Sequence, residues 1–202
     1  MTQHPVPKIR IGFSHLTYNN IAKPLWEYYG PDRPITGPEK AQEVILEYKQ
    51  VWQPHEQALL QGMCDLFDLS FYKNVLDVYI SPGAPVMSTP LMINTRTDAD
   101  EFIDVLTHEL LHVLISDNTT LTLEKIIDFF EKVYPDHNQR TRNHILVHAG
   151  HKHLYLNVLK EPRRLTRDIA SCKDAPDYAK AWEIVEERGY QKIIDEFKAR
   201  YR

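Results

Sequence analysis

One short segment of the chain carries residues whose types and spacing suit metal chemistry. His108-Glu109-Leu110-Leu111-His112 places two histidines four residues apart, with a glutamate directly after the first. On a helix such histidines are about 40° from each other and one turn apart, so both imidazoles lie on one face. Two imidazoles placed in this way can bind one Zn²⁺ at about 2.0–2.1 Å. Glu109 is about 100° round the helix from His108 and can reach a water on the metal, as a general base must.

The surroundings of this segment favour a buried helix over a solvated one. Leu110 and Leu111 fill the two free positions of HExxH, and further apolar residues extend this character on both sides: Val105, Leu106, Val113 and Leu114. The competing interpretation is an ordinary buried helix with two histidines, in which Glu109 forms a salt bridge elsewhere. A five-residue motif is a hypothesis until its structural context is known.

The ten residues from Val105 to Leu114 resemble the active-site helix of the zincin metallopeptidases. The order of strands and helices around them extends the likeness to about residues 74–159, whereas residues 1–70 and 160–202 match no part of that family. The resemblance implies a minimal zincin fold and zinc-dependent hydrolysis of peptide bonds, with a peptide or protein substrate. In that chemistry His108 and His112 hold Zn²⁺, and Glu109 takes a proton from the metal-bound water and passes it to the leaving amine.

The third metal ligand has to come from elsewhere, because a catalytic Zn²⁺ usually has three protein ligands and one open position. The metzincin pattern HExxHxxGxxH fails, since Ile115 stands where it needs Gly and Asn118 where it needs His. Gluzincins use a glutamate on a second helix, with an acidic residue four positions on. Glu124 and Asp128 have that spacing, but Glu124 is only 12 residues past His112, which leaves little chain for a return.

A histidine-rich segment offers better candidates. Residues 144–153 hold four of the ten histidines of the chain. On a helix His144, His148, His151 and Tyr155 fall in one stripe about 60° wide. Buried imidazoles need partners, and a metal held by the HExxH helix is one. We expect His148 as the third ligand and His144 as the second choice, one ligating and the other orienting a ligand. The alternative is a set of hydrogen-bonded histidines without metal.

A tyrosine completes the predicted catalytic group. Tyr155 shares the stripe of histidines and could donate a hydrogen bond to the oxyanion of the transition state. Tyr134 is another option, and both could equally be structural. Asp104 lies one turn before His108 and could accept an imidazole N–H.

The elements that position these residues follow from periodicity and helix breakers. Strands are predicted at 8–13, 74–81 and 91–94, the last two as a hairpin or as neighbours in one sheet around a turn at 82–90. Helices are predicted at 39–51, 54–67, 97–116, 121–134, 139–159, 163–171, 178–188 and 190–201. Prolines and glycines in 24–38 predict an irregular loop, which could act as a lid. We therefore expect an α+β, mostly helical single domain over 1–202 with a small sheet, zincin-like, its core at about 74–159.

Composition narrows the class of protein further. The net charge of −4 argues against a nucleic-acid binder, and two cysteines are too few for a disulfide framework. Only seven glycines and no GxGxxG or GxxxxGK[ST] motif argue against a nucleotide site. Without a signal peptide or a long apolar run, we expect a soluble cytoplasmic protein that uses no membrane. Oligomeric state stays open. The rival functions are a non-catalytic metal-binding or interaction protein and a metal-free helical regulator.

Overall fold

The computed structural model describes residues 4–29 and 38–201 of the chain. By their contacts they form two compact units, each described by itself. The sheet unit comprises Pro7–Gln57 and Lys73–Leu110, and the helical unit comprises Met1–Val6, Ala58–Tyr72 and Leu111–Arg202. The class is mixed, mostly helical with a small four-stranded sheet, as the sequence predicts. The expectation of one domain over the whole chain stays a prediction.

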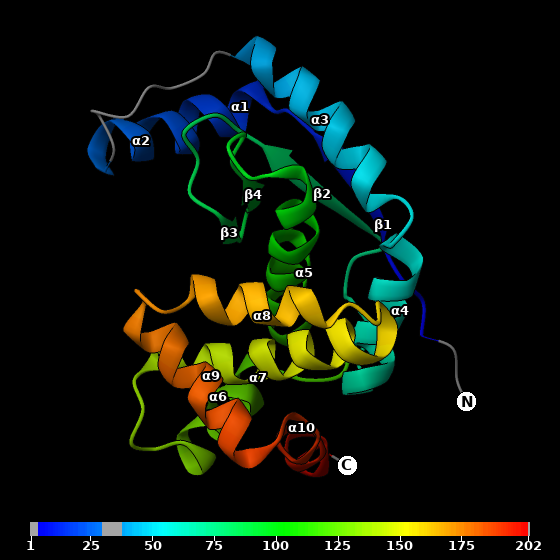
Figure 1. The fold of residues 1–202 in the computed structure, drawn as a ribbon, viewed down its shortest axis with the longest axis vertical. Coiled ribbons are helices and arrows are strands. Elements are labelled where there is room, and N and C mark those ends of the chain that lie inside the picture. The colour runs from blue at the N-terminus through cyan, green and yellow to red at the C-terminus, as the bar shows by residue number, and fades with distance from the viewer. Residues whose placement is uncertain (1–3, 30–37, 202) are drawn as a thin grey trace. The chain divides into compact units, whose positions relative to one another are not determined.

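The sheet has the strand order β1-β2-β4-β3 (Figure 1). Strands β1 (Lys8–Gly12), β2 (Val75–Ile80) and β4 (Leu91–Ile93) are parallel, and β3 (Met87–Ser88) runs antiparallel to β4. The three predicted strands are confirmed. Of the two alternatives for the last two strands, neighbours in one sheet is confirmed and the hairpin is wrong, since β2 and β4 are parallel neighbours. The predicted turn at 82–90 contains the short β3.

Helices cover the sheet within its unit. The chain continues from β1 through α1 (His15–Thr17), the π-helix η1 (Tyr18–Ala22), α2 (Lys23–Tyr29) and α3 (Pro38–Trp52), and α3 packs against β1 and β2. Residues 24–29 of the predicted loop are therefore helical, and 30–37 lie outside the described residues. Tyr48 of α3 stacks on Phe102 at 4.0 Å between ring centroids. Its hydroxyl donates to the Thr97 carbonyl at 2.6 Å, which ties α3 to the chain just before the HExxH helix.

The helical unit is organised round α7 (Gln139–His153), which packs against α9 (Pro176–Arg188) and α10 (Tyr190–Ala199). The other elements of this unit are α6 (Leu123–Val133), the π-helix η2 (Leu154–Val158), α8 (Pro162–Ser171) and most of α4 (Glu56–Phe67). The predicted helix at 139–159 is α7 continued by η2. Asn138 caps α7, its side-chain oxygen accepting from the Thr141 N–H at 2.9 Å.

Helix α5 (Ala99–Ser116) carries the HExxH segment and belongs to both units, because the boundary falls between Leu110 and Leu111.

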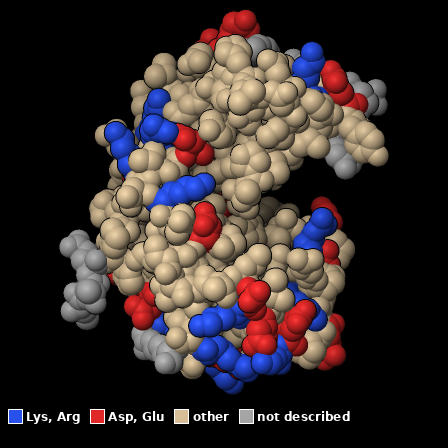
Figure 2. Space-filling view, turned by 180° about the vertical axis from the view of Figure 1, so that it is seen from behind, with Lys and Arg blue, Asp and Glu red and all other residues tan. Residues whose placement is uncertain are grey.

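On the face drawn in Figure 2, the basic and acidic side chains of the described residues lie interspersed, which agrees with the small net charge. Among the described residues no helix has the length and apolar character needed to cross a membrane.

Candidate metal centre

The helix that carries HExxH forms where the sequence predicts it, and local interactions explain its start. The Asp98 carboxylate accepts from the Asp100 N–H at 2.9 Å, and its carbonyl accepts from the Phe102 N–H at 2.8 Å. Asp100 and Glu101 in the first turn suit the positive end of the helix dipole. Phe102, Leu106 and Leu110 are fully buried, whereas His108 and His112 are half-buried. The helix therefore buries one side and keeps its two histidines together on another.

A glycine lets α7 come close to the last turns of α5. A Cβ atom on Gly150 would lie 3.0 Å from Leu111 Cδ2 and 3.2 Å from Phe67 Cε2, which is tighter than ordinary van der Waals contact. The approach brings the next residue of α5, His112, against His144 of α7. Their ring centroids are 4.9 Å apart, with an interplanar angle of 83°.

Three imidazoles meet at this contact. His108, His112 and His144 each offer one nitrogen, and these nitrogens all lie within 4.8 Å of one another. His108 lies one turn before His112 on the same helix, α5, and His144 lies on α7. Two helices therefore supply the three imidazoles. His108 and His112, the predicted pair, are thus joined by His144, the second choice for the third ligand. We call these residues the histidine cluster.

The ring of His144 is oriented for metal binding. Its Nδ1 lies 2.7 Å from the Arg140 carbonyl oxygen and donates to it, which leaves the lone pair of the imidazole on Nε2. Its ring also packs on Tyr178, at 3.9 Å between centroids. Burial lowers the pKa of His144, so its imidazole stays neutral, as a metal ligand must be.

His112 is held neutral by the same cause. Burial lowers its pKa to about 3, with smaller contributions from His144 and His151. Three imidazoles without a carboxylate are a donor set that suits Zn²⁺ and other late first-row ions better than Mg²⁺ or Ca²⁺. The residues present therefore fit the predicted metal.

Glu109 follows His108 on α5 and is 7% exposed. Burial raises the pKa of its carboxyl group to about 7, because the charged form loses its hydration. A carboxylate with such a pKa is a stronger base than an exposed glutamate and can also return a proton near neutral pH.

His148, the first choice for the third ligand, lies elsewhere. It is fully buried and stacks on Trp182 of α9, with ring centroids 4.4 Å apart and an interplanar angle of 11°. Its nitrogens are not part of the group of three. Glu124, the other candidate, is exposed in the first turn of α6. The geometry favours His144 over both.

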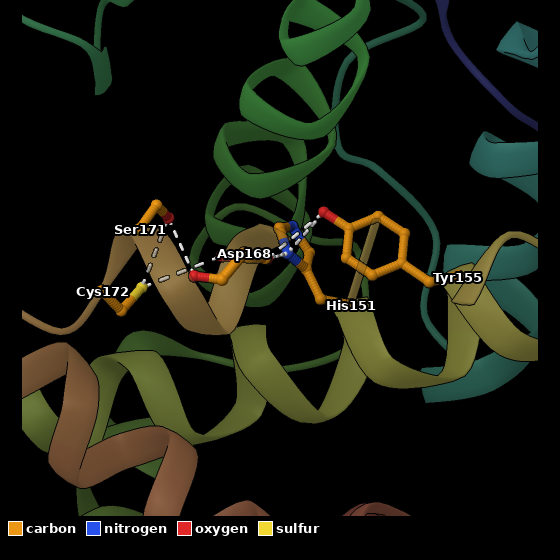
Figure 3. Close-up of polar contacts among 5 residues, drawn as sticks. All are labelled: His151, Tyr155, Asp168, Ser171 and Cys172. Atoms are coloured by element: carbon orange, nitrogen blue, oxygen red, sulfur yellow. Dashed lines mark hydrogen bonds and ion pairs between the residues drawn. The ribbon is translucent and has the colours of Figure 1, made fainter. Parts of the chain in front are cut away.

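Tyr155 belongs to a buried polar group that sequence reasoning did not foresee (Figure 3). Its hydroxyl lies 3.0 Å from His151 Nδ1 and 3.3 Å from Asp168 Oδ2, and Tyr155 itself is fully buried. The same His151 nitrogen pairs with the Asp168 carboxylate. These contacts do not test whether the Tyr155 hydroxyl reaches a substrate. Its role as an oxyanion donor therefore stays a prediction. The Tyr134 side chain is also buried, next to the Arg188 guanidinium.

Asp168 is the residue of this group that the sequence conceals. Burial opposes its ionisation, but the charge and hydrogen bond of His151 outweigh burial and lower the pKa of the carboxyl group. Asp168 follows three arginines on the amphipathic α8, a pattern that favours a solvated face. The only signal was the stripe of buried histidines on α7, which needed a partner.

Comparison of the chain with protein-family models, with curated proteins and with solved structures finds no match. The resemblance to zincins therefore stays a prediction that depends on the HExxH segment, and the function has to be argued from the site itself.

Proposed function

We propose that this protein is a zinc-dependent hydrolase of peptide bonds. The observation that carries the proposal is the histidine cluster, whose three nitrogens lie within 4.8 Å of one another, with Glu109 directly after His108 in the sequence. Three protein nitrogens leave the fourth position of a tetrahedral ion open, which distinguishes catalytic from structural zinc sites.

The metal and the chain have separate tasks in this proposal. When bound, Zn²⁺ supplies a Lewis acid that polarises a carbonyl group and makes water more acidic. The Arg140 carbonyl accepts from Nδ1 of His144, so Nε2 is the nitrogen of that ring that keeps a lone pair for a metal. His108 and His112 need no such outside support for their spacing, because one helix turn sets it.

Glu109 is the proposed general base. Its carboxylate accepts a proton from the attacking water and then donates it to the nitrogen of the leaving amine. Burial supports both steps, since a carboxyl group with a pKa of about 7 exchanges protons readily near neutral pH. The peptide bond as substrate follows from the resemblance of residues 105–114 to zincins.

The test is the isosteric substitution Glu109→Gln. We expect hydrolysis of a mixed peptide library, followed by mass spectrometry, to fall by about 10²-fold or more, which is the usual contribution of a general base. Metal analysis should still find zinc, because Glu109 is not a ligand. Glu124→Gln, an exposed glutamate on α6, is the matched control and should change neither.

The wild-type rate should also depend on pH in the way that a base requires. Because the pKa of Glu109 is about 7, the rate should fall as pH drops below 7. Full activity of Glu109→Gln would overturn the proposal. Zinc bound at one equivalent by a wild-type protein that cleaves no peptide would favour the rival function, a non-catalytic metal-binding protein.

A further inference from the structure

The outer edge of β1 is a second feature with the properties of a binding site. β1 is the first strand in the sheet order, and in the described part of the chain no strand pairs with its outer side. The unpaired edge of a sheet presents N–H and C=O groups to which another extended chain can hydrogen-bond. The feature lies wholly in the sheet unit and does not depend on the metal centre.

The pairing of β1 with β2 shows which backbone groups face outward. The Lys8 N–H donates to the Asn74 carbonyl at 3.0 Å, so Lys8 directs its backbone groups toward β2. Along a strand these directions alternate, and the backbone groups of Ile9 and Ile11 therefore point away from β2. The Ile9 N–H indeed reaches a Glu56 carboxylate oxygen, at 3.5 Å. The Glu56 carboxylate thus takes the place that a carbonyl group of a neighbouring strand would have. Its distance is at the long limit of a hydrogen bond.

A groove of about 650 Å³ runs beside this edge. One wall is Lys8–Ile11 of β1, and the other is the corner between α3 and α4, formed by Lys49, Trp52, Gln53, Glu56 and Gln57. Figure 1 shows α3 lying alongside β1, and contacts between the two elements confirm it. The groove thus combines an open strand edge with space next to it.

The charges in the groove favour an acidic occupant. Lys8 and Lys49 are exposed, and Glu56 is the single carboxylate of the lining. Arg10 also lines the groove but forms a bidentate pair with Asp77, at 2.7 and 2.9 Å. Its charge is therefore largely matched, and the two lysines leave a positive excess.

We propose that the outer edge of β1 binds an extended peptide segment with acidic side chains. The segment adds a strand to the sheet: its backbone pairs with Ile9 and Ile11, and it displaces the Glu56 carboxylate from the Ile9 N–H. Its carboxylates lie against the ammonium groups of Lys8 and Lys49. Backbone hydrogen bonds supply affinity in such strand addition, and side chains supply selectivity.

The experiment uses the full-length ¹⁵N-labelled protein and a capped hexapeptide of alternating valine and glutamate. Its addition at low salt should shift the amide signals of Ile9 and Ile11 in a saturable way. The same peptide with N-methylated backbone amides keeps its side chains but cannot donate to the strand edge. It should bind at least about tenfold more weakly. Equal binding of the two peptides would overturn strand addition.

Charge is tested separately. Lys8→Glu combined with Lys49→Glu should weaken binding of the acidic peptide by about tenfold, whereas Lys125→Glu in the other unit should not. Undisturbed amide spectra of the variants would show that both still fold. A valine–lysine peptide that binds the wild type equally well would overturn the acidic preference. If the amide signals of Ile9 and Ile11 change with protein concentration in the absence of peptide, a second copy of the chain binds at the edge. This result would also overturn the proposal.

This inference fails or holds independently of the proposed function. Glu109→Gln and removal of metal by a chelator should leave peptide binding at β1 unchanged, because no residue of the groove belongs to the histidine cluster. Peptide binding that disappears with the metal would place the peptide at the cluster instead and overturn the site at β1.

Discussion

Burial sets the protonation of the individual residues that we place in the metal centre. It lowers the pKa of His112 to about 3 and raises that of Glu109 to about 7, because both groups lose hydration in their charged forms. His112 is therefore ready to ligate at neutral pH without losing a proton first. The same burial makes Glu109 a base that can also act as an acid.

The identity of the third ligand is testable by substitution. His144→Ala should weaken zinc binding by at least about 100-fold, since it removes one of three donors. His148→Ala should keep zinc but lose about 1–3 kcal/mol of stability, because it leaves a cavity beside Trp182. Metal analysis and urea unfolding measure the two effects.

The two variants also control each other, since each removes one buried imidazole from α7. Zinc lost only from His148→Ala would restore that residue as the ligand. If both variants keep zinc, neither His144 nor His148 is the third ligand.

Most of these residues could be predicted from the sequence, but which of two histidines is the third candidate ligand could not. His144 and His148 are one turn apart in a single stripe, and helical periodicity cannot distinguish them. The neighbours decide: His112 of α5 lies against His144, whereas Trp182 of α9 covers His148. The candidate pair His108 and His112 could be predicted because a single helix turn contains both.

Individual helices and strands follow the sequence where their periodicity is long and uninterrupted. The helices at 97–116 and 121–134 appear as α5 and α6, shifted by one or two residues. The sequence missed α2, because Pro24 suggested a loop, whereas helical backbone continues without a break from α1 through the π-helix η1 into α2. It also left the relation of β2 and β4 open, since strand pairing depends on contacts that local patterns do not encode.

Helix α8 is tied to α7 by the buried pair of Asp168 and His151, and this tie can be measured. Asp168→Asn should cost about 3 kcal/mol at pH 7, since it removes the buried carboxylate that pairs with His151. The folded-state pKa of Asp168 is lowered, so its stabilising effect is present above its unfolded pKa and is lost as pH falls through the folded pKa. The difference from wild type should therefore shrink in acid.

Urea unfolding at pH 7 and at pH 3 checks this expectation. Asp174→Asn, which replaces an exposed aspartate three residues past the end of α8, is the control and should unfold like the wild type. Identical midpoints for Asp168→Asn and wild type at pH 7 would show that the pair does not hold α8.

For the molecule as a whole, metal binding and folding should be linked. The histidine cluster needs both α5 and α7 in place, so Zn²⁺ binds the folded chain in preference to the unfolded one. An excess of free Zn²⁺ of 100 times its Kd should stabilise the fold by about 2.7 kcal/mol. Thermal unfolding should shift upward with zinc and downward with a chelator.

This shift should be absent in His144→Ala and retained in His15→Ala, which replaces an exposed histidine outside the cluster. A wild-type melting temperature that responds neither to zinc nor to chelation would contradict a metal centre between α5 and α7.

The sequence by itself determined the mixed, mostly helical class of the fold, the HExxH helix and its three candidate residues, because these depend on patterns within single elements. The tertiary structure decided that His144 joins His108 and His112, that Asp168 pairs with His151, and that no strand of the described residues pairs with the outer edge of β1. Each of these depends on segments far apart in the chain that packing brings together. Helical and strand periodicity give the direction of a side chain within its element, whereas the partner on the next element depends on how the core is filled.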